Sequence, residues 1–290
     1  MSAAAAITRT PVRLAISDPR ERGEAILFVH GFSHNHSVWH EVEASLPERW
    51  RPVSVDLRGH GESDWSPAGE YDLPDYASDL SGCLDALGIA RAHVVGHSLG
   101  GNVCTLFCAE HPDRVRSLTL VDTGPSLAIE GAAHVLGEVG DAFRSYPSIE
   151  AFRTQLSRLH PVGEGALLDR LARASLVRRL DGRYEPALDP GVLGEGLGPV
   201  DSRAARTMEE TLWQALRALE CPVLVLRGGL SSILSEEVAH RMVDAELAAG
   251  RLETLPRAGH AIMIDEPAGL GRQLVDFLDA VVEASAPSAR

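Results

Sequence analysis

The chain has 290 residues, of which 44% are hydrophobic and 23% are charged, and its formal net charge is −14. This composition is typical of a globular protein with a sizeable core, and the acidic balance argues against nucleic acid or an anionic membrane as a partner. No apolar run approaches the roughly 20 residues of a membrane span, and the first residues lack the basic and hydrophobic regions of a signal peptide. We therefore expect a cytoplasmic protein.

Four cysteines are spread along the chain without any Cys-x-x-Cys pair, and they are Cys83, Cys104, Cys108 and Cys221. The spacing between Cys104 and Cys108 is one helical turn, which suits packing inside a core. No further ligands stand at a spacing that zinc would require. We therefore predict buried, reduced thiols, as in a cytoplasmic protein.

The first 125 residues alternate short apolar runs with amphipathic stretches. The runs predict strands over 12–17, 25–29, 51–56 and 115–121, with a further short strand ending at Gly96. Helices are predicted over 38–46, 73–87 and 102–108. Because strands alternate with helices, we expect a doubly wound, mostly parallel sheet.

This alternation stops between residues 126 and 216, where several helices are predicted. They are expected over 131–144, 148–159, 165–180 and 203–218, with a glycine-rich connection over 191–198. An insertion of this kind lies at the carboxyl edge of a doubly wound sheet, where ligands bind. We interpret 126–216 as a lid whose partial opening admits substrate.

Strands and helices alternate again after the insertion. Strands are predicted over 222–226 and 251–255, and helices over 235–247 and 267–282. The last helix begins at Pro267, and proline favours the first turn of a helix. The second part of the chain therefore completes the same sheet.

The stretch from Gly96 to Gly101 has the form Gly-x-Ser-x-Gly between a predicted strand and a predicted helix. A turn this sharp forces Ser98 into a strained conformation and needs small neighbours, which Gly96 and Gly100 supply. The Ser98 hydroxyl would then stand at the carboxyl end of a parallel sheet, near a helix N-terminus. Unpaired N–H groups and positive partial charge at that terminus suit a developing oxyanion.

Four motifs occur together and in order: His30-Gly31-Phe32, the stretch Asp56-x-Arg58-Gly59-His60-Gly61-x-Ser63, the serine motif, and Ala258-Gly259-His260. With them the chain resembles the α/β-hydrolase fold superfamily, in its lidded esterase, lactonase and C–C hydrolase branch. The resemblance covers residues from about 10 to 285. It implies a doubly wound, mostly parallel eight-stranded sheet with a helical lid inserted after the sixth strand. The core is then expected over 1–125 and 217–290, and the lid over 126–216.

The resemblance also assigns roles to individual residues. Ser98 is similar to the family nucleophile and His260 to its general base, which removes the serine proton and later returns it to the leaving group. The backbone N–H groups of Phe32 and Leu99 correspond to the oxyanion hole. No cofactor is implied.

The triad acid is where the sequence departs from the family pattern. The usual place is the loop after the strand 222–226, but no carboxylate stands there before Glu236, and Ser232 occupies the position where an aspartate is expected. Asp122 follows the preceding strand and is our preferred acid, although an aspartate in such a turn also serves as a cap. Asp265 is a weaker candidate because it follows His260 in a loop.

Several histidines and the Asp56 motif permit simpler interpretations. We read His97 as packing beside the serine turn, and residues 56–63 as shaping a loop beside the site. The run containing His34, His36 and His40 could bind zinc, but no acidic partner accompanies it. We therefore favour a pocket-lining role for these histidines and predict no metal.

These features favour a serine hydrolase that cleaves an ester, thioester or lactone of a small, mostly apolar molecule through an acyl-enzyme. The family also contains C–C bond hydrolases, and it contains cofactor-free perhydrolases or haloperoxidases with the same triad. A non-catalytic member that binds a ligand under its lid is a further alternative. Ser98 argues against the epoxide hydrolase and haloalkane dehalogenase branches of the family, which use an aspartate nucleophile. The expected partner is a small-molecule acyl substrate.

Overall fold

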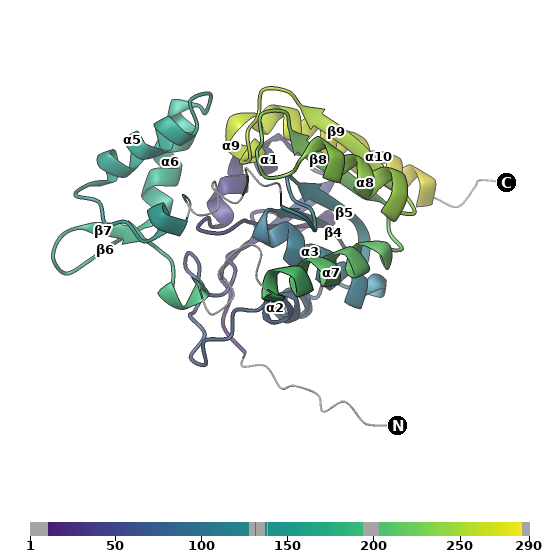
Figure 1. Ribbon diagram of the computed structural model, residues 1–290, viewed down its shortest axis with the longest axis horizontal. Coiled ribbons are helices and arrows are strands. Elements are labelled where there is room, and N and C mark those ends of the chain that lie inside the picture. Colours follow the sequence, from purple (N-terminus) through teal and green to yellow (C-terminus); the bar gives the residue numbers. More distant parts are fainter. Residues whose placement is uncertain (1–10, 128–130, 132–136, 138, 194–202, 286–290) are drawn as a thin grey trace.

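The computed structural model describes residues 11–127, 131, 137, 139–193 and 203–285. A seven-stranded sheet with the order β1-β3-β2-β4-β5-β8-β9 lies at the centre, and helices cover it on both sides (Figure 1). The strands of this sheet are β1 (Ile16–Ser17), β2 (Glu24–Val29), β3 (Trp50–Val55), β4 (Ala92–His97), β5 (Val115–Val121), β8 (Val223–Gly228) and β9 (Gly250–Leu255).

Every neighbouring pair in this sheet is parallel except β1 with β3. The inner strand β2 is almost wholly buried because it pairs with β3 on one side and β4 on the other and contributes to a hydrophobic cluster on each face. In this register Val29 lies opposite both Val55 and Gly96. The residues that follow β2, β3, β4 and β5 therefore leave the sheet at one edge, as the alternating pattern predicts.

Helices form one layer on each face of the sheet. The core helices are α1 (His40–Ser45), α2 (Leu73–Ala86), α3 (Leu99–Glu110), α7 (Arg203–Arg217), α8 (Glu236–Arg241), α9 (Ile262–Asp265) and α10 (Pro267–Ser285). Buried side chains of α2, α3 and α7 pack in one hydrophobic cluster, and those of α1, α9 and α10 pack in a second. The two clusters use opposite faces of the strands, since Leu27 and Val29 belong to one and Ile26 and Phe28 to the other.

Short turns connect or extend several of these helices. They are η1 (His36–Trp39), η2 (Pro112–Arg114) and η3 (Pro190–Leu193), together with the π-helical turn η4 (Met242–Glu246) that follows α8. Helix α2 begins with a capping box in which Asp72 and Asp75 bond each other's backbone amides, which fixes its start near the predicted position.

The described sheet has seven strands, one fewer than the eight that the resemblance implies, and the insertion follows its fifth strand, β5, rather than a sixth. The predicted strand 12–17 is reduced to β1. Its earlier backbone groups bond a loop instead of a strand: Arg13 O accepts from Asp64 N at 2.9 Å, and Ala15 N donates to Ser63 Oγ at 2.8 Å.

Residues 139–193, here called the insert, lie to one side of the sheet (Figure 1). They contain α5 (Ile149–Leu159), α6 (Gly165–Ala174) and a hairpin of β6 (Leu176–Arg178) and β7 (Tyr184–Pro186). The predicted helix 165–180 is therefore wrong beyond Ala174. The hairpin forms because Gly182 adopts a positive φ of 84° in the turn that joins Arg179 to Arg183.

Parts of the predicted lid fall outside the described residues, namely much of the helix 131–144 and most of the glycine-rich connection 191–198. The prediction for residues 148–159 agrees with α5, and that for 203–218 agrees with α7. Helix α7 packs its buried Leu212, Trp213 and Leu216 into the cluster that contains α3. The last part of the range 126–216 therefore lies against the core layer.

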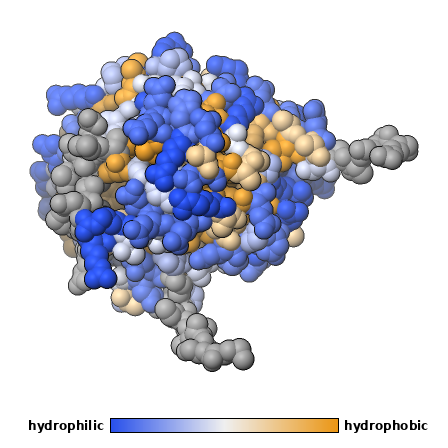
Figure 2. All heavy atoms as spheres, turned by 45° about the vertical axis from the view of Figure 1, so that its right-hand side comes forward, coloured by the Kyte–Doolittle hydropathy of each residue, from blue (hydrophilic) through white to orange (hydrophobic). Residues whose placement is uncertain are grey.

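The molecular surface is mainly hydrophilic on the face drawn in Figure 2, with hydrophobic residues gathered toward the right of that view. No helix in the described ranges is both long and apolar enough to cross a lipid bilayer. The described cysteines are unpaired, and burial raises the pKa of the Cys104 and Cys108 thiols. These thiols pack in the core, as the spacing predicts.

Candidate active site

Ser98 stands between β4 and α3 in a backbone conformation that serine rarely adopts. Its φ is 51° and its ψ is −121°, so the chain turns sharply at this residue. Its carbonyl accepts hydrogen bonds from the amides of Gly101 and Asn102 and from the Thr123 hydroxyl, at 2.9, 3.1 and 3.0 Å. These bonds hold the turn, and the Ser98 residue itself is only partly buried.

Glycine is required on both sides of the turn because the backbone of α3 approaches the sheet closely. A Cβ atom on Gly100 would lie 2.3 Å from the His30 carbonyl oxygen and 2.5 Å from that of Val29. A Cβ atom on Gly96 would lie 2.6 Å from the Gly100 carbonyl oxygen. The Gly-x-Ser-x-Gly pattern thus reflects a steric need of this strand–turn–helix unit.

The loop after β2 is fixed by the buried imidazole of His30. Leu57 N donates to His30 Nε2 at 3.0 Å, so the ring proton is on Nδ1, which donates to the Gly31 carbonyl at 2.7 Å. Burial lowers the pKa of His30 to about 3, and the ring is therefore neutral. Because carbonyl and amide of one trans peptide point in opposite directions, this bond turns the Phe32 N–H away from His30.

Leu99 is expected to supply the second amide. It is the first residue of α3, and the first amides of a helix have no partner within the helix. The turn brings Ser98 close to the loop after β2, since a Cβ atom on Gly31 would lie 3.0 Å from Ser98 Cβ. The two amides expected to form an oxyanion hole, those of Phe32 and Leu99, therefore border the serine from two neighbouring elements.

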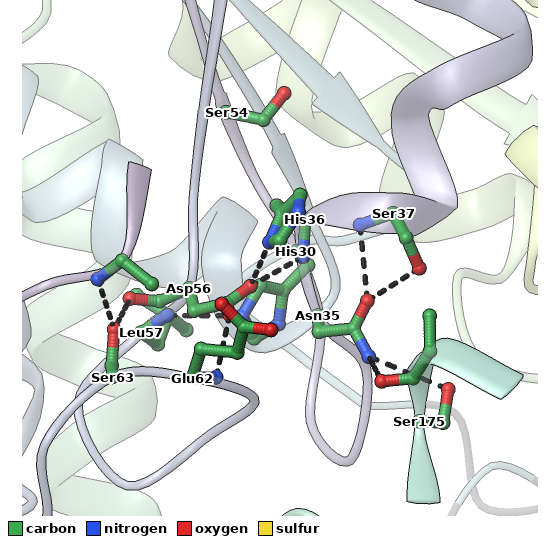
Figure 3. Close-up of polar contacts among 12 residues, drawn as sticks. His30, Asn35, His36, Ser37, Ser54, Asp56, Leu57, Glu62, Ser63 and Ser175 are labelled. Atoms are coloured by element: carbon green, nitrogen blue, oxygen red, sulfur yellow. Dashed lines mark hydrogen bonds and ion pairs between the residues drawn. The ribbon is translucent and has the colours of Figure 1, made fainter. Parts of the chain in front are cut away.

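Asp56 supports the same loop from the end of β3 (Figure 3). Its carboxylate is fully buried and accepts from the backbone N and from Nδ1 of His36, at 2.6 and 2.8 Å, and from Glu62 N at 2.8 Å. Its carbonyl accepts from Ser63 Oγ at 2.6 Å. Asp56 thereby joins the loop after β2 to residues 56–63, in agreement with the loop-shaping role expected for this motif.

The charges in this cluster are interdependent. The hydrogen bond to Asp56 raises the pKa of His36, which is about one-third exposed. Burial alone would raise the pKa of Asp56, but hydrogen bonding from His36, with the nearby histidines and Glu62 N, brings that pKa below its usual value. The ionised pair is thus favoured by its own hydrogen bonds.

His260 follows β9 and meets Asp122 in the interior. His260 Nδ1 lies 2.7 Å from Asp122 Oδ2, and the side chains are 5% and 0% exposed. Asp122 follows β5 in a backbone conformation with φ of 47°, and its N–H donates to the Leu226 carbonyl at 2.7 Å. The structure therefore brings together the preferred acid and the expected base, with the carboxylate on the Nδ1 side of the imidazole.

Two further groups bond the Asp122 carboxylate, and the sequence did not reveal either. Gly228 N donates to Oδ1 at 2.8 Å, and the Ser231 hydroxyl donates to Oδ2, the oxygen that also bonds His260. Both donors come from the end of β8 and its loop, where the family pattern would place the acid. The serine pair 231–232 in that loop was the signal that could have indicated a supporting hydroxyl.

His97 packs directly against the imidazole of His260. The two ring centroids are 4.5 Å apart, and His97 Nε2 lies 3.1 Å from the His260 carbonyl oxygen, to which it donates. Burial, followed in size by the nearby His260, lowers the pKa of His97 well below its usual value, so it is neutral. The contact is consistent with the packing role predicted for His97, and it extends to the backbone of the base.

The insert contacts the loop after β2 and the loop that carries His260. Asn35 Nδ2 donates to the carbonyl of Ala174, at the end of α6, at 3.2 Å (Figure 3). Asp265 accepts from Gly259 N at 2.8 Å and lies 3.1 Å from His160 Nδ1, at the end of α5. Asp265 therefore connects the turn before His260 to the insert. The carboxylate at His260 Nδ1 is that of Asp122.

The three histidines considered as zinc ligands have different partners. His36 bonds Asp56, His34 stacks on His97 with ring centroids 5.7 Å apart, and His40 is exposed. Over the ranges that the structure describes, no group of three or more His, Cys, Asp or Glu side chains is arranged to hold a metal ion.

Comparison with known proteins agrees with this architecture. A sequence model of the alpha/beta hydrolase fold family matches residues 24–267, so the chain belongs to that family. It is 30% identical over 269 residues to 2-(acetamidomethylene)succinate hydrolase of Mesorhizobium japonicum, covering 90% of this chain and 91% of the relative. It is also 30% identical to pimeloyl-[acyl-carrier protein] methyl ester esterase of Neisseria meningitidis, covering 91% of this chain and 79% of the esterase.

A solved structure shows the same likeness. The crystal structure of E-2-(acetamidomethylene)succinate hydrolase superposes with a TM-score of 0.80, at 26% identity, over 92% of this chain and 96% of the other. Family, relatives and fold together make this chain a hydrolase. One of these relatives is named for a small-molecule substrate, 2-(acetamidomethylene)succinate.

Proposed function

We propose that the chain is a serine hydrolase that cleaves an ester, thioester or lactone bond of a small, mostly apolar molecule. Ser98 is the nucleophile, His260 the general base and Asp122 the acid of the triad. The observation that carries the proposal is the buried His260–Asp122 pair at 2.7 Å, whose imidazole packs against His97, the residue before a serine held in a strained turn. A strained, partly exposed serine next to an oriented imidazole is the arrangement that nucleophilic catalysis requires.

The proposed reaction has two halves. The His260 imidazole takes the Ser98 proton as the hydroxyl attacks the carbonyl carbon, and the amides of Phe32 and Leu99 stabilise the resulting oxyanion. The protonated imidazole then gives its proton to the leaving group, which leaves the acyl-enzyme. Water, deprotonated by His260, attacks the acyl carbon, and the acid is released as Ser98 regains its proton.

Asp122 serves this cycle by holding the imidazole in the tautomer whose Nε2 is free to accept the serine proton. With Nδ1–H donated to Asp122, the imidazolium formed in each half is stabilised by an adjacent carboxylate. One relative supports attack on a carbonyl carbon, because it is named as a methyl ester esterase.

The decisive experiment uses a fluorophosphonate probe and a panel of acyl esters, thioesters, lactones and short acetamido compounds. We expect covalent labelling at Ser98 in the wild type and turnover of at least one compound class. Ser98→Ala should lose labelling and should lower turnover by several orders of magnitude. Absence of labelling, with the protein folded, would favour the ligand-binding alternative, and near-wild-type turnover by Ser98→Ala would exclude Ser98 as nucleophile.

We also propose that the insert acts in the lid expected over residues 126–216 and controls entry to the site. The support is its attachment to the loop after β2, where Asn35 bonds Ala174 and Ser175, and to the loop that carries His260, where Asp265 faces His160. Hydrogen exchange should be faster in α5 and α6 than in strands β2, β4 and β5. Equal protection of the two regions would contradict the lid.

A further inference from the structure

The loop after β8 contains a hydroxyl that none of the proposed chemical steps uses. Ser231 Oγ donates to Asp122 Oδ2, the same oxygen that lies 2.7 Å from His260 Nδ1. Ile233 N donates to Ser231 Oγ at 3.0 Å. Because a lone pair of the hydroxyl is occupied by that amide and an ionised carboxylate only accepts, the hydroxyl proton is directed to Asp122.

The Ser231 loop is itself fastened to the strand that carries the base. Gly229 N donates to the Leu255 carbonyl at 2.7 Å, and Leu230 N donates to the Ala258 carbonyl at 2.9 Å. Ser231 N donates to the Gly228 carbonyl at 3.0 Å, which closes the turn. The hydroxyl therefore connects the end of β5 with a loop whose position is set by the chain leading to His260.

The Asp122 carboxylate needs such support because its own backbone is strained and it arises from an adjacent strand. Its φ is 47°, and its carboxylate can rotate about the Cβ–Cγ bond of the side chain. Rotation about the Cβ–Cγ bond would carry Oδ1 away from Gly228 N and Oδ2 away from the imidazole of His260. Ser231 is the group placed to prevent this rotation.

We propose that Ser231 is a positioning residue for the triad acid, acting on catalysis only through Asp122, which rests on the proposed function of Ser98, His260 and Asp122. Its hydroxyl fixes the direction of Oδ2 and shares the negative charge that stabilises the imidazolium. The loop after β8 is where the family pattern places the triad acid. In this chain Ser231 stands in that loop as a hydrogen-bond donor, and the proposed acid, Asp122, follows the neighbouring strand β5.

Removing the hydroxyl should change catalysis in a recognisable way. Ser231→Ala should lower kcat roughly tenfold, the size expected for one lost hydrogen bond to a charged group, with KM nearly unchanged. The lost donor leaves more negative charge facing the imidazolium, so the acid limb of the kcat/KM profile should move to higher pH. Ser231→Thr, which keeps the hydroxyl, should restore the wild-type profile.

Ser232→Ala is the matched control, because it removes the same group from the next residue of the same loop. We expect it to keep the wild-type kcat and pH profile. If Ser231→Ala and Ser232→Ala give the same kcat and the same acid limb, the proposal is overturned. A tenfold loss without any movement of the acid limb would also overturn it, since that result describes a loop that is merely loosened.

A proton NMR measurement separates this proposal from the proposed function. The His260 Nδ1–H donated to Asp122 should give a downfield imidazole resonance, assigned by its loss in His260→Gln. Ser231→Ala should shift or broaden that resonance, while Ser232→Ala should leave it in place, whether or not a substrate is turned over. An unchanged resonance in Ser231→Ala contradicts the positioning role even if the fluorophosphonate labels Ser98.

Discussion

Two buried aspartates at the carboxyl edge of the sheet each hold a histidine through Nδ1, and the two pairs differ in what surrounds them. Asp122–His260 and Asp56–His36 have nearly equal distances, 2.7 and 2.8 Å, and both carboxylates are inaccessible to solvent. His260 is 5% exposed and packs against His97 beside the serine turn. The side chain of His36 is 31% exposed and lies where the chain enters η1.

The comparison shows that an Asp–His hydrogen bond does not by itself identify a catalytic pair. Around Asp122, the further donors are a backbone amide and a hydroxyl from a neighbouring strand end, and all of them direct the carboxylate toward the imidazole. Around Asp56, the further donors are the backbone amides of His36 and Glu62. The first pair orients a side chain, whereas the second ties two loops together.

The sharpest way to test this contrast is Asp122→Asn. We expect kcat to fall by about 10³–10⁴, or roughly 4–5 kcal/mol of transition-state stabilisation, because an amide imposes the wrong imidazole tautomer. Steady-state kinetics at matched folded fraction measure the loss. Glu236→Gln, in the first turn of α8, is the control and should change kcat little. A nearly neutral Asp122→Asn would make Asp122 a turn residue only.

The corresponding change in the second pair, Asp56→Asn, should act mainly on stability. Asn cannot neutralise His36⁺, and its single oxygen cannot accept all three hydrogen bonds that the two carboxylate oxygens of Asp56 accept. We therefore expect a loss of roughly 2–3 kcal/mol in the free energy of unfolding. Urea unfolding measures it, and kcat should fall far less than in Asp122→Asn. A loss of kcat as large as that of Asp122→Asn, at unchanged stability, would contradict the distinction between the pairs.

The strands that lead to His30 and Asp122 were predictable from sequence because each is covered on both faces and therefore reads as an apolar run. Residues 25–29 and 115–121 are examples, and their ends place His30 and Asp122 at one edge. The four motifs named Ser98 and His260, whose roles stay predictions. The family of the chain was also predictable, and it is confirmed.

What could not be predicted depends on contacts between residues far apart in the chain. The Ser231 hydroxyl reaches Asp122 across 109 positions, and no local pattern encodes that bond. The helix expected over 165–180 ends early because Leu176–Arg178 pairs with Tyr184–Pro186, across a turn that contains Asp181-Gly182. The first strand is shorter than predicted because residues 13 and 15 bond a loop.

A smaller effect, dependent on pH, is expected from His36→Gln. The pKa of His36 is raised in the folded protein, so its bond to Asp56 contributes stability that is fully present below the unfolded pKa of 6.5 and is lost as pH rises through the folded value. Glu43 and Glu62 also face His36 and act in the same direction. We expect His36→Gln to lower the free energy of unfolding by about 1 kcal/mol near pH 5.5 and by almost nothing near pH 9.

Equal destabilisation by His36→Gln at both pH values would mean that the contact is a neutral hydrogen bond. The matched control is His40→Gln, since His40 is exposed at the start of α1 and does not bond Asp56 in the described structure. We expect His40→Gln to leave the free energy of unfolding unchanged at either pH within a few tenths of a kcal/mol.

The smallest effect is expected from Asp265→Asn, which tests the third carboxylate near His260. Asp265 accepts from Gly259 N through Oδ2 and faces His160 Nδ1 through Oδ1. Asn can still accept from Gly259 N and can donate to a neutral imidazole, so we expect kcat and KM to change by less than about threefold. Asp265→Ala removes both bonds and should raise KM more than it lowers kcat, because the turn before His260 would lose its tie to the insert. A large fall in kcat by Asp265→Asn together with a small effect of Asp122→Asn would move the acid to Asp265.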